Sequence, residues 1–211
     1  MANALWMILY RLDPARADTY LRWFHEQHIP EKLARPGYSW AAHYRVPTGR
    51  ETAEPTCIAL FGGDDSRVFY DPSPAQIKPR QTPETRDMMS CRRDSRMLIL
   101  AREWSAGGAS ADTAIGTGQI QLALFDANGN DEQLGAWLAQ DFLPAHAAGV
   151  THKYLASSGS PRHLLIHEPA DASAEPLLER AWNDWSEQVA GYLSYPAGEP
   201  LLAQRIWPVA E

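Results

Sequence analysis

The sequence predicts an α+β protein of two tandem ferredoxin-like units, each with the order β-α-β-β-α-β, whose antiparallel sheets pack together as an α+β barrel. Three observations support this fold class. The order of strand and helix patterns occurs twice, a stretch rich in small residues separates the two copies, and a tryptophan and a proline recur at matching places. We assign residues 1–104 to the first unit, 105–118 to a linker and 119–211 to the second unit.

The first unit begins with ALWMILYRL (4–12), a run of β-forming and aromatic residues that is typical of a strand. Asp13 and Pro14 follow as an N-cap and first-turn pair, so a helix is expected directly after the strand. Pro36-Gly37 ends the helical pattern. The predicted strands are 4–12, 38–46, 56–63 and 96–103, and a second helix is predicted at about 83–92.

The first helix carries one face suited to a protein core, because apolar and aromatic residues recur along it at helical spacing. One histidine shares that face. The face holds Tyr20, Leu21, Trp23, Phe24 and His28, while Arg22, Glu26 and Lys32 fall elsewhere on the helix. We therefore expect His28 to point inward.

The same order restarts after the linker. Its last helix begins with a capping serine, Ser173. The predicted strands are 119–126, 149–157, 161–168 and 200–208, and the predicted helices lie within 128–144 and 173–193.

An internal repeat relates the two units weakly in sequence but consistently in layout. WFHEQHIPE, from Trp23, can be laid on WLAQDFLPA, from Trp137, so that Pro30 falls on Pro144. In that register Phe142 stands where His28 stands. We interpret this difference as polar chemistry kept in one unit and replaced by packing in the other.

Composition excludes several classes of function. A net charge of −7 and a pI near 5.5 argue against binding to nucleic acid or to an anionic membrane. Two cysteines form no disulfide framework, and the N-terminal segment lacks the pattern of a signal peptide, so a cytoplasmic location is expected. Phosphate-binding loops, nucleophile elbows and dinucleotide fingerprints are absent, and we expect no organic cofactor.

At WFHEQHIPEKLARPGYSWAAHYR (23–45) the sequence resembles the dimeric α+β barrel superfamily, in particular its EthD-like branch. The second unit matches only in layout and at Trp137, Pro144, Gly149 and Tyr154. The resemblance implies the barrel fold, and similar barrels include cofactor-free monooxygenases, polyketide cyclases, lactone isomerases and haem-binding peroxidases or dismutases. The resemblance to this superfamily rests on Trp23, His28, Pro30, Pro36, Gly37, Tyr38 and Tyr44.

His28 is the leading candidate for general acid/base catalysis, because an imidazole can accept and return a proton near neutral pH. His25 and Tyr10 are expected to assist it. The alternative is a buried structural histidine bonded to a backbone carbonyl. His25 and His28 could also hold a metal with His43 or Glu31, but their spacing is weak evidence, and we predict no metal site.

Aromatic residues on the neighbouring strands suit a flat ligand, although core packing is the plainer explanation, because aromatic residues in a strand usually pack against a helix. Strand alternation places Tyr38, Trp40 and Tyr44 on one face of 38–46 and His43 on the other. The candidate substrate-binding residues are Trp6, Trp23, Tyr38, Trp40, His43 and Tyr44. The histidines of the second unit, which share no spacing, are expected to be structural or exposed: His146, His152, His163 and His167.

These observations favour a cofactor-free enzyme acting on an aromatic or polyketide-like small molecule through a histidine base. The expected reaction is isomerisation, cyclisation, dehydration, decarboxylation or quinol oxygenation. Two alternatives stay open: a non-catalytic protein that binds an aromatic ligand, and a haem- or metal-dependent barrel enzyme. The tandem repeat could close its barrel within one chain or still form a homodimer.

Overall fold

Strands with apolar side chains on both faces need cover on both sides, and the chain supplies it by closing a barrel and placing helices outside it. The computed structural model describes residues 3–47, 54–107, 115, 118–146, 148–170, 177–178, 183–198 and 200–208. Its strands are β1 (Ala4–Leu12), β2 (Tyr38–Val46), β3 (Thr56–Gly63), β4 (Arg92–Ala106), β5 (Gln119–Ala127), β6 (Gly149–Ser158), β7 (His163–Pro169), β8 (Leu193–Ser194) and β9 (Leu201–Trp207).

The strands form one antiparallel ring in the order β7-β6-β4-β1-β3-β2-β9-β5, and β5 pairs with β7 to close it. The short β8 pairs with β5 outside this ring. Two strands join the halves: β4 pairs with both β1 and β6, and β9 pairs with both β2 and β5. The predicted fold class, two β-α-β-β-α-β layouts packed as an α+β barrel, is therefore confirmed.

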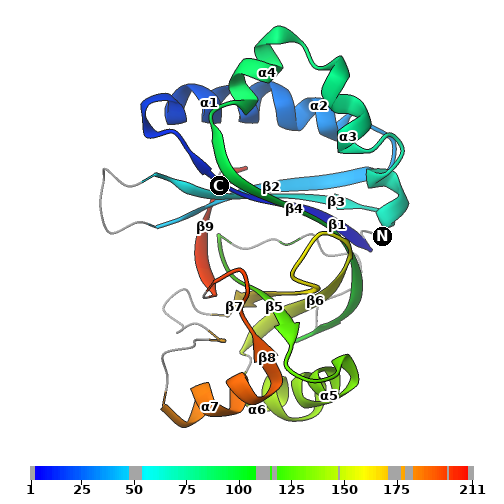
Figure 1. The fold of residues 1–211 in the computed structure, drawn as a ribbon, viewed down its shortest axis with the longest axis vertical. Helices are drawn as coiled ribbons and strands as arrows, with labels where there is room; N and C mark the ends of the chain where they lie inside the picture. The colour runs from blue at the N-terminus through cyan, green and yellow to red at the C-terminus, as the bar shows by residue number, and fades with distance from the viewer. Residues whose placement is uncertain are drawn as a thin grey trace.

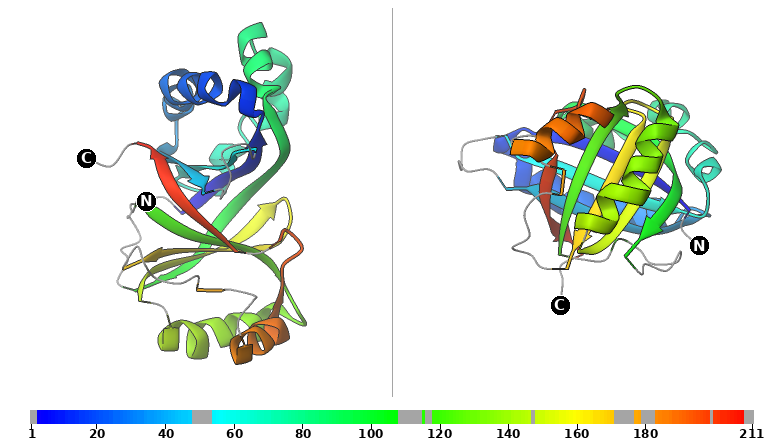
Figure 2. Two further views of the ribbon diagram at one scale, coloured as in Figure 1. Left: turned by 90° about the vertical axis from the view of Figure 1, so that its left-hand side faces the viewer. Right: turned by 90° about the horizontal axis from the view of Figure 1, so that it is seen from below.

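Helices cover the two outer faces of this barrel (Figures 1 and 2). Those of the first half lie above one sheet face and those of the second half below the opposite one. They are α1 (Ala17–Trp23), α2 (Ile29–Leu33), α3 (Pro74–Ile77), α4 (Pro83–Met89), α5 (Asp131–Trp137), α6 (Leu143–His146) and α7 (Asn183–Tyr192). No helix among the described residues is both long and apolar enough to span a bilayer.

Three clusters of buried side chains follow from this layering. One fills the barrel between the two sheets, where Leu5, Met7, Leu60 and Leu122 meet. The second lies between the first sheet, formed by β1–β4, and α1–α2. The third lies between the second sheet, formed by β5, β6, β7 and β9, and α5–α7. The barrel interior is thus packed with side chains, most of them apolar.

The predicted strands 4–12, 38–46 and 56–63 match β1, β2 and β3 residue for residue. The strand predicted at 96–103 is longer, because β4 runs from Arg92 into the segment expected to be a linker. The helix predicted at about 83–92 ends at Met89. Of the helix predicted at 173–193, the structure describes α7, and Ser173 lies outside the described residues.

A π-helical turn interrupts each of the two repeated helices at the same place. It spans Phe24–His28 in the first half and Leu138–Phe142 in the second, each directly after the tryptophan that the repeat aligns. Trp23 packs against His28 and Trp137 against Phe142, and both pairs have ring centroids 4.8 Å apart. The structure therefore confirms the register of the internal repeat, including the exchange of histidine for phenylalanine.

Candidate functional site

A cavity of about 430 Å³ lies between the first sheet and its helices, and we call it the helix-side cavity. Residues of β1, α2, the segment 74–81 and the start of β4 line it. Its apolar wall includes Trp6, Ile8 and Met89. Four buried or partly buried polar side chains line it, namely His28, Lys32, Gln81 and Arg92, and the exposed Lys78 and Ser95 lie at its edge.

His28 is held on the cavity wall by aromatic packing. The residue is 4% exposed, and its ring stacks on Phe24 at 5.4 Å. Its Nδ1 atom is shielded from solvent and has no hydrogen-bond partner among the described residues; Glu31 approaches it only to 4.0 Å. Burial, reinforced by the charges of Lys32 and Arg92, lowers the pKa of His28 to about 2, so the ring is neutral near pH 7.

Lys32 lies on the same helix face as His28, four residues further on. It is 6% exposed, and its Nζ lies 5.9 Å from the centroid of the Trp6 ring. Burial, with a smaller contribution from Arg35, lowers its pKa to about 8. The expectation that Lys32 falls away from the inward face was wrong. It gave the charge of the lysine more weight than its i, i+4 spacing from His28.

Arg92 completes the polar side of the cavity. Its Nε donates to the Tyr20 hydroxyl at 2.5 Å, and its guanidinium lies 4.3 Å from the centroid of the Tyr10 ring. Its Nη2 is shielded from solvent and, like Nδ1 of His28, has no hydrogen-bond partner in the described structure. The sequence reasoning missed Arg92, which is the second residue of the basic run CRRDSR (91–96).

A line of hydrogen bonds leads from Arg92 to the half-buried His25. Tyr20 donates to the Tyr10 hydroxyl at 3.3 Å, Tyr10 lies 2.9 Å from Nε2 of His43, and Nδ1 of His43 lies 2.8 Å from Nε2 of His25. Arg92 donates to Tyr20 and Tyr20 to Tyr10, and the same direction continues to His25 when Tyr10 donates to His43 and His43 to His25. This direction places the His43 proton on Nδ1. Burial raises the pKa of Tyr10 and lowers the pKa of His43, which keeps both neutral.

The predicted site residues therefore fall in different places. His28 and Trp6 line the helix-side cavity, while Tyr10, His43 and His25 form the hydrogen-bonded line beside it. Trp23 packs against His28.

The three aromatic residues expected on one face of β2 do not share it. Trp40 and Tyr44 face the barrel interior, whereas Tyr38 packs on the helix side against Phe61 and Phe69. The pairing of β2 with β3 shifts register between Tyr38 and Trp40, and a bulge of this kind breaks strict alternation. The placement of Tyr38 beside Trp40 and Tyr44 was wrong for that reason.

Buried histidines of the second half are hydrogen-bonded. Nδ1 of His152 lies 2.8 Å from the Ser105 hydroxyl and its Nε2 3.1 Å from Glu168, while Nδ1 of His167 lies 2.8 Å from the Thr151 hydroxyl. The side chain of His146 lies outside what the structure describes. Within the described ranges, no three His, Cys, Asp or Glu side chains are grouped so that they could hold a metal ion.

No protein-family model matches the sequence, and a search of curated proteins finds no relative. Solved structures do share its fold. A candidate monooxygenase from Fusobacterium nucleatum aligns with a TM-score of 0.58 at 9% identity, over 96% of this chain and 92% of that one. An anthrone oxidase-like protein aligns with a TM-score of 0.50 at 13% identity, over 98% and 92% of the two chains. A candidate chlorite dismutase aligns with a TM-score of 0.52 at 12% identity, over 96% and 95%.

Proposed function

We propose that this protein is an enzyme that removes a proton from a hydrophobic, aromatic small molecule bound in the helix-side cavity. The observation that carries the proposal is that Nδ1 of His28 and Nη2 of Arg92, on side chains lining the same cavity, have no hydrogen-bond partner among the described residues. A buried polar atom without a partner is costly in a folded protein. A substrate that supplied an acidic hydrogen and an oxygen would satisfy both atoms.

In this mechanism His28 is the proton acceptor. With its own proton on Nε2, the neutral ring takes the substrate proton at Nδ1, and the bonding electron pair stays on the substrate as a phenolate or enolate. Arg92 and protonated Lys32 stabilise that anion, which in turn favours the imidazolium that forms beside it. The ring needs no prior deprotonation, since its pKa is held at about 2.

Tyr10 and His25 act through Arg92 in this proposal, because neither lines the cavity. The line of hydrogen bonds from Tyr20 to His25 gives Arg92 a fixed acceptor, and the Tyr10 ring supports the face of its guanidinium. Tyr10, His43 and His25 are therefore positioning residues rather than groups that touch the substrate.

The size and lining of the cavity support an aromatic substrate, because about 430 Å³ is within the range of pockets for small organic ligands. Fold neighbours named as a candidate monooxygenase and an anthrone oxidase-like protein agree with oxidation of such a compound by dioxygen. The resemblance to the EthD-like branch points the same way. Isomerisation, cyclisation, dehydration or decarboxylation would begin with the same proton transfer.

The test uses anthrone and 1,4-naphthalenediol as probes, with dioxygen consumption and product chromatography as readouts. We expect turnover by the wild type and a loss of turnover of about 10²-fold or more in His28→Phe. This substitution is chosen because Phe142 packs on Trp137 at the equivalent place in the second half. Equal turnover by both proteins would dispose of the assignment. Tight binding without turnover would favour a ligand carrier, and a Soret band or stoichiometric metal in the purified protein would favour a haem or metal enzyme.

A further inference from the structure

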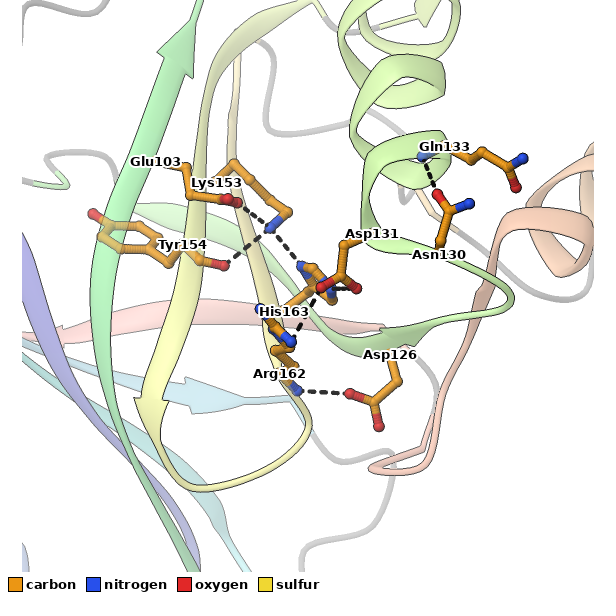
Figure 3. A network of polar contacts seen from close by, with 9 residues as sticks. All are labelled: Glu103, Asp126, Asn130, Asp131, Gln133, Lys153, Tyr154, Arg162 and His163. Carbon is orange, nitrogen blue, oxygen red and sulfur yellow. Dashed lines mark hydrogen bonds and ion pairs between the residues drawn. The ribbon is translucent and has the colours of Figure 1, made fainter.

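A second cavity, of about 150 Å³, lies in the other half of the molecule, between the second sheet and α5. Its apolar side includes Trp104 and Leu134. Its polar side is formed by Glu103, Asp131, Lys153, Arg162 and His163, which come from β4, α5, β6 and β7 and the turn before β7 (Figure 3). The structure thus brings five charged or titratable side chains from four elements to one small space.

Lys153 is the most deeply placed of these groups, with a side chain only 2% exposed. Its Nζ contacts the Glu103 carboxylate at 2.6 Å, the Tyr154 carbonyl oxygen at 3.2 Å and Nδ1 of His163 at 2.8 Å. An ammonium group has three protons and no lone pair, so it donates to all three. Glu103 reaches it because the pairing of β4 with β6 shifts register between Arg102 and Trp104.

His163 lies between this amine and a carboxylate, as Figure 3 shows. Nδ1 accepts from Lys153, so the neutral ring carries its proton on Nε2, and Nε2 lies 3.0 Å from Asp131. The imidazole also stacks on Phe125 with an interplanar angle of 12°, which fixes the plane of the ring. Asp131 in turn pairs with Arg162 at 3.2 Å and remains partly open to solvent.

We infer that Lys153, His163 and Asp131 form an amine nucleophile, its base and the group that orients the base, and that the second cavity binds a small aldehyde or ketone. The proposal rests on geometry. In covalent catalysis the nucleophile lies within hydrogen-bond distance of a base, and a third group orients that base. Burial also lowers the pKa of Lys153, which makes its neutral amine easier to form. The proposal does not depend on the function proposed for the helix-side cavity.

The step is a condensation that needs no oxidant. The Lys153 ammonium passes one proton to His163, and Asp131 stabilises the imidazolium. The amine attacks the carbonyl carbon, a C–N bond forms, and the addition product moves a second amine proton to its oxygen. His163 returns its proton to this hydroxyl group. The C–O bond breaks, water departs, and a protonated imine remains beside Glu103. Ammonium and carbonyl compound thus become iminium and water, with one positive charge on each side.

The cavity limits the size of the carbonyl compound. At roughly 30 Å³ for each water-sized group, about 150 Å³ holds about five non-hydrogen atoms. Propanal fits within this limit, whereas benzaldehyde, with eight such atoms, exceeds it.

The test is reductive trapping on the full chain. The protein is incubated with propanal and cyanoborohydride at pH 7.5, and labelled peptides are quantified by mass spectrometry. The sequence has three lysines, so the exposed Lys78 and the buried Lys32 serve as internal references. We expect Lys153 to label at least tenfold faster than Lys78 with propanal, and benzaldehyde to reverse that order.

Two variants separate chemistry from structure. His163→Gln, which removes the base, should reduce labelling of Lys153 at least tenfold, and Asp131→Asn, at a partly exposed position, should reduce it severalfold. Labelling of Lys78 should not change, and circular dichroism should show that both variants remain folded. Labelling of Lys153 no faster than of Lys78, or unchanged in folded His163→Gln, would overturn the proposal and leave the cluster as a structural ion network.

Discussion

The Tyr10 hydroxyl lies 2.9 Å from Nε2 of His43, fully buried on the side of the sheet that faces α1. Tyr10 accepts from Tyr20, which itself accepts from Arg92, so the proton of Tyr10 is available for donation to His43. This bond joins the arginine of the helix-side cavity to the buried His43 and, through it, to the half-buried His25.

Replacing Tyr10 by Phe should destabilise the protein by about 1–3 kcal/mol, because Nε2 of His43 and the Tyr20 hydroxyl would each lose a buried partner. Urea unfolding measures the change. The matched control is Tyr70→Phe, which removes a hydroxyl bonded to Ser157 from an exposed residue and should cost no more than about 0.5 kcal/mol. Equal effects in the two variants would contradict the buried line of hydrogen bonds.

Replacing His28 should separate catalysis from packing. His28→Ala is expected to lower turnover by about two to four orders of magnitude, and it also leaves a cavity. His28→Phe should lower turnover equally yet keep the free energy of unfolding within about 1.5 kcal/mol of the wild type, since Phe142 packs on Trp137 as His28 packs on Trp23. Full activity in folded His28→Phe would show that His28 is not the base.

The alkaline side of the pH–rate profile should report Lys32. Protonated Lys32 stabilises the substrate anion, so kcat/KM is expected to fall as the pH rises through about 8, where this lysine loses its proton. Lys32→Arg should retain activity above that pH, because a guanidinium stays charged. Activity that rises through pH 8 in the wild type and not in Lys32→Arg would instead identify the Lys32 amine as the base.

Stability should decrease below neutral pH. The pKa of His28 is about 2 in the folded protein and near 6.5 in the unfolded chain, so between these values the unfolded state binds the extra proton. Acidification from pH 7 to pH 4 should therefore lower the urea midpoint. His28→Phe should reduce the dependence without abolishing it, because burial also lowers the pKa of His43 and His25. An identical pH dependence in variant and wild type would mean that the pKa of His28 does not differ between the folded and unfolded states.

Local patterns were sufficient for most of the fold. Runs of β-forming residues and turn residues delimited β1 to β3. The Trp23–Trp137 register aligned two helices, in which the structure places π turns at equivalent positions. Spacing on the helix also placed His28 inward, since a helical face is a property of nearby residues. These features depend on interactions within a few positions of the chain.

Contacts between distant segments were beyond the reach of those patterns. Arg92 meets Tyr20 and Tyr10 only because β4 pairs beside β1, and the bulge that turns Tyr38 away from Trp40 depends on the partner strand β3. The sequence by itself determined the order of elements and the inward face that carries His28. Tertiary structure alone decided which charges share a cavity with that histidine, because burial and the resulting pKa values arise from residues brought together by sheet pairing.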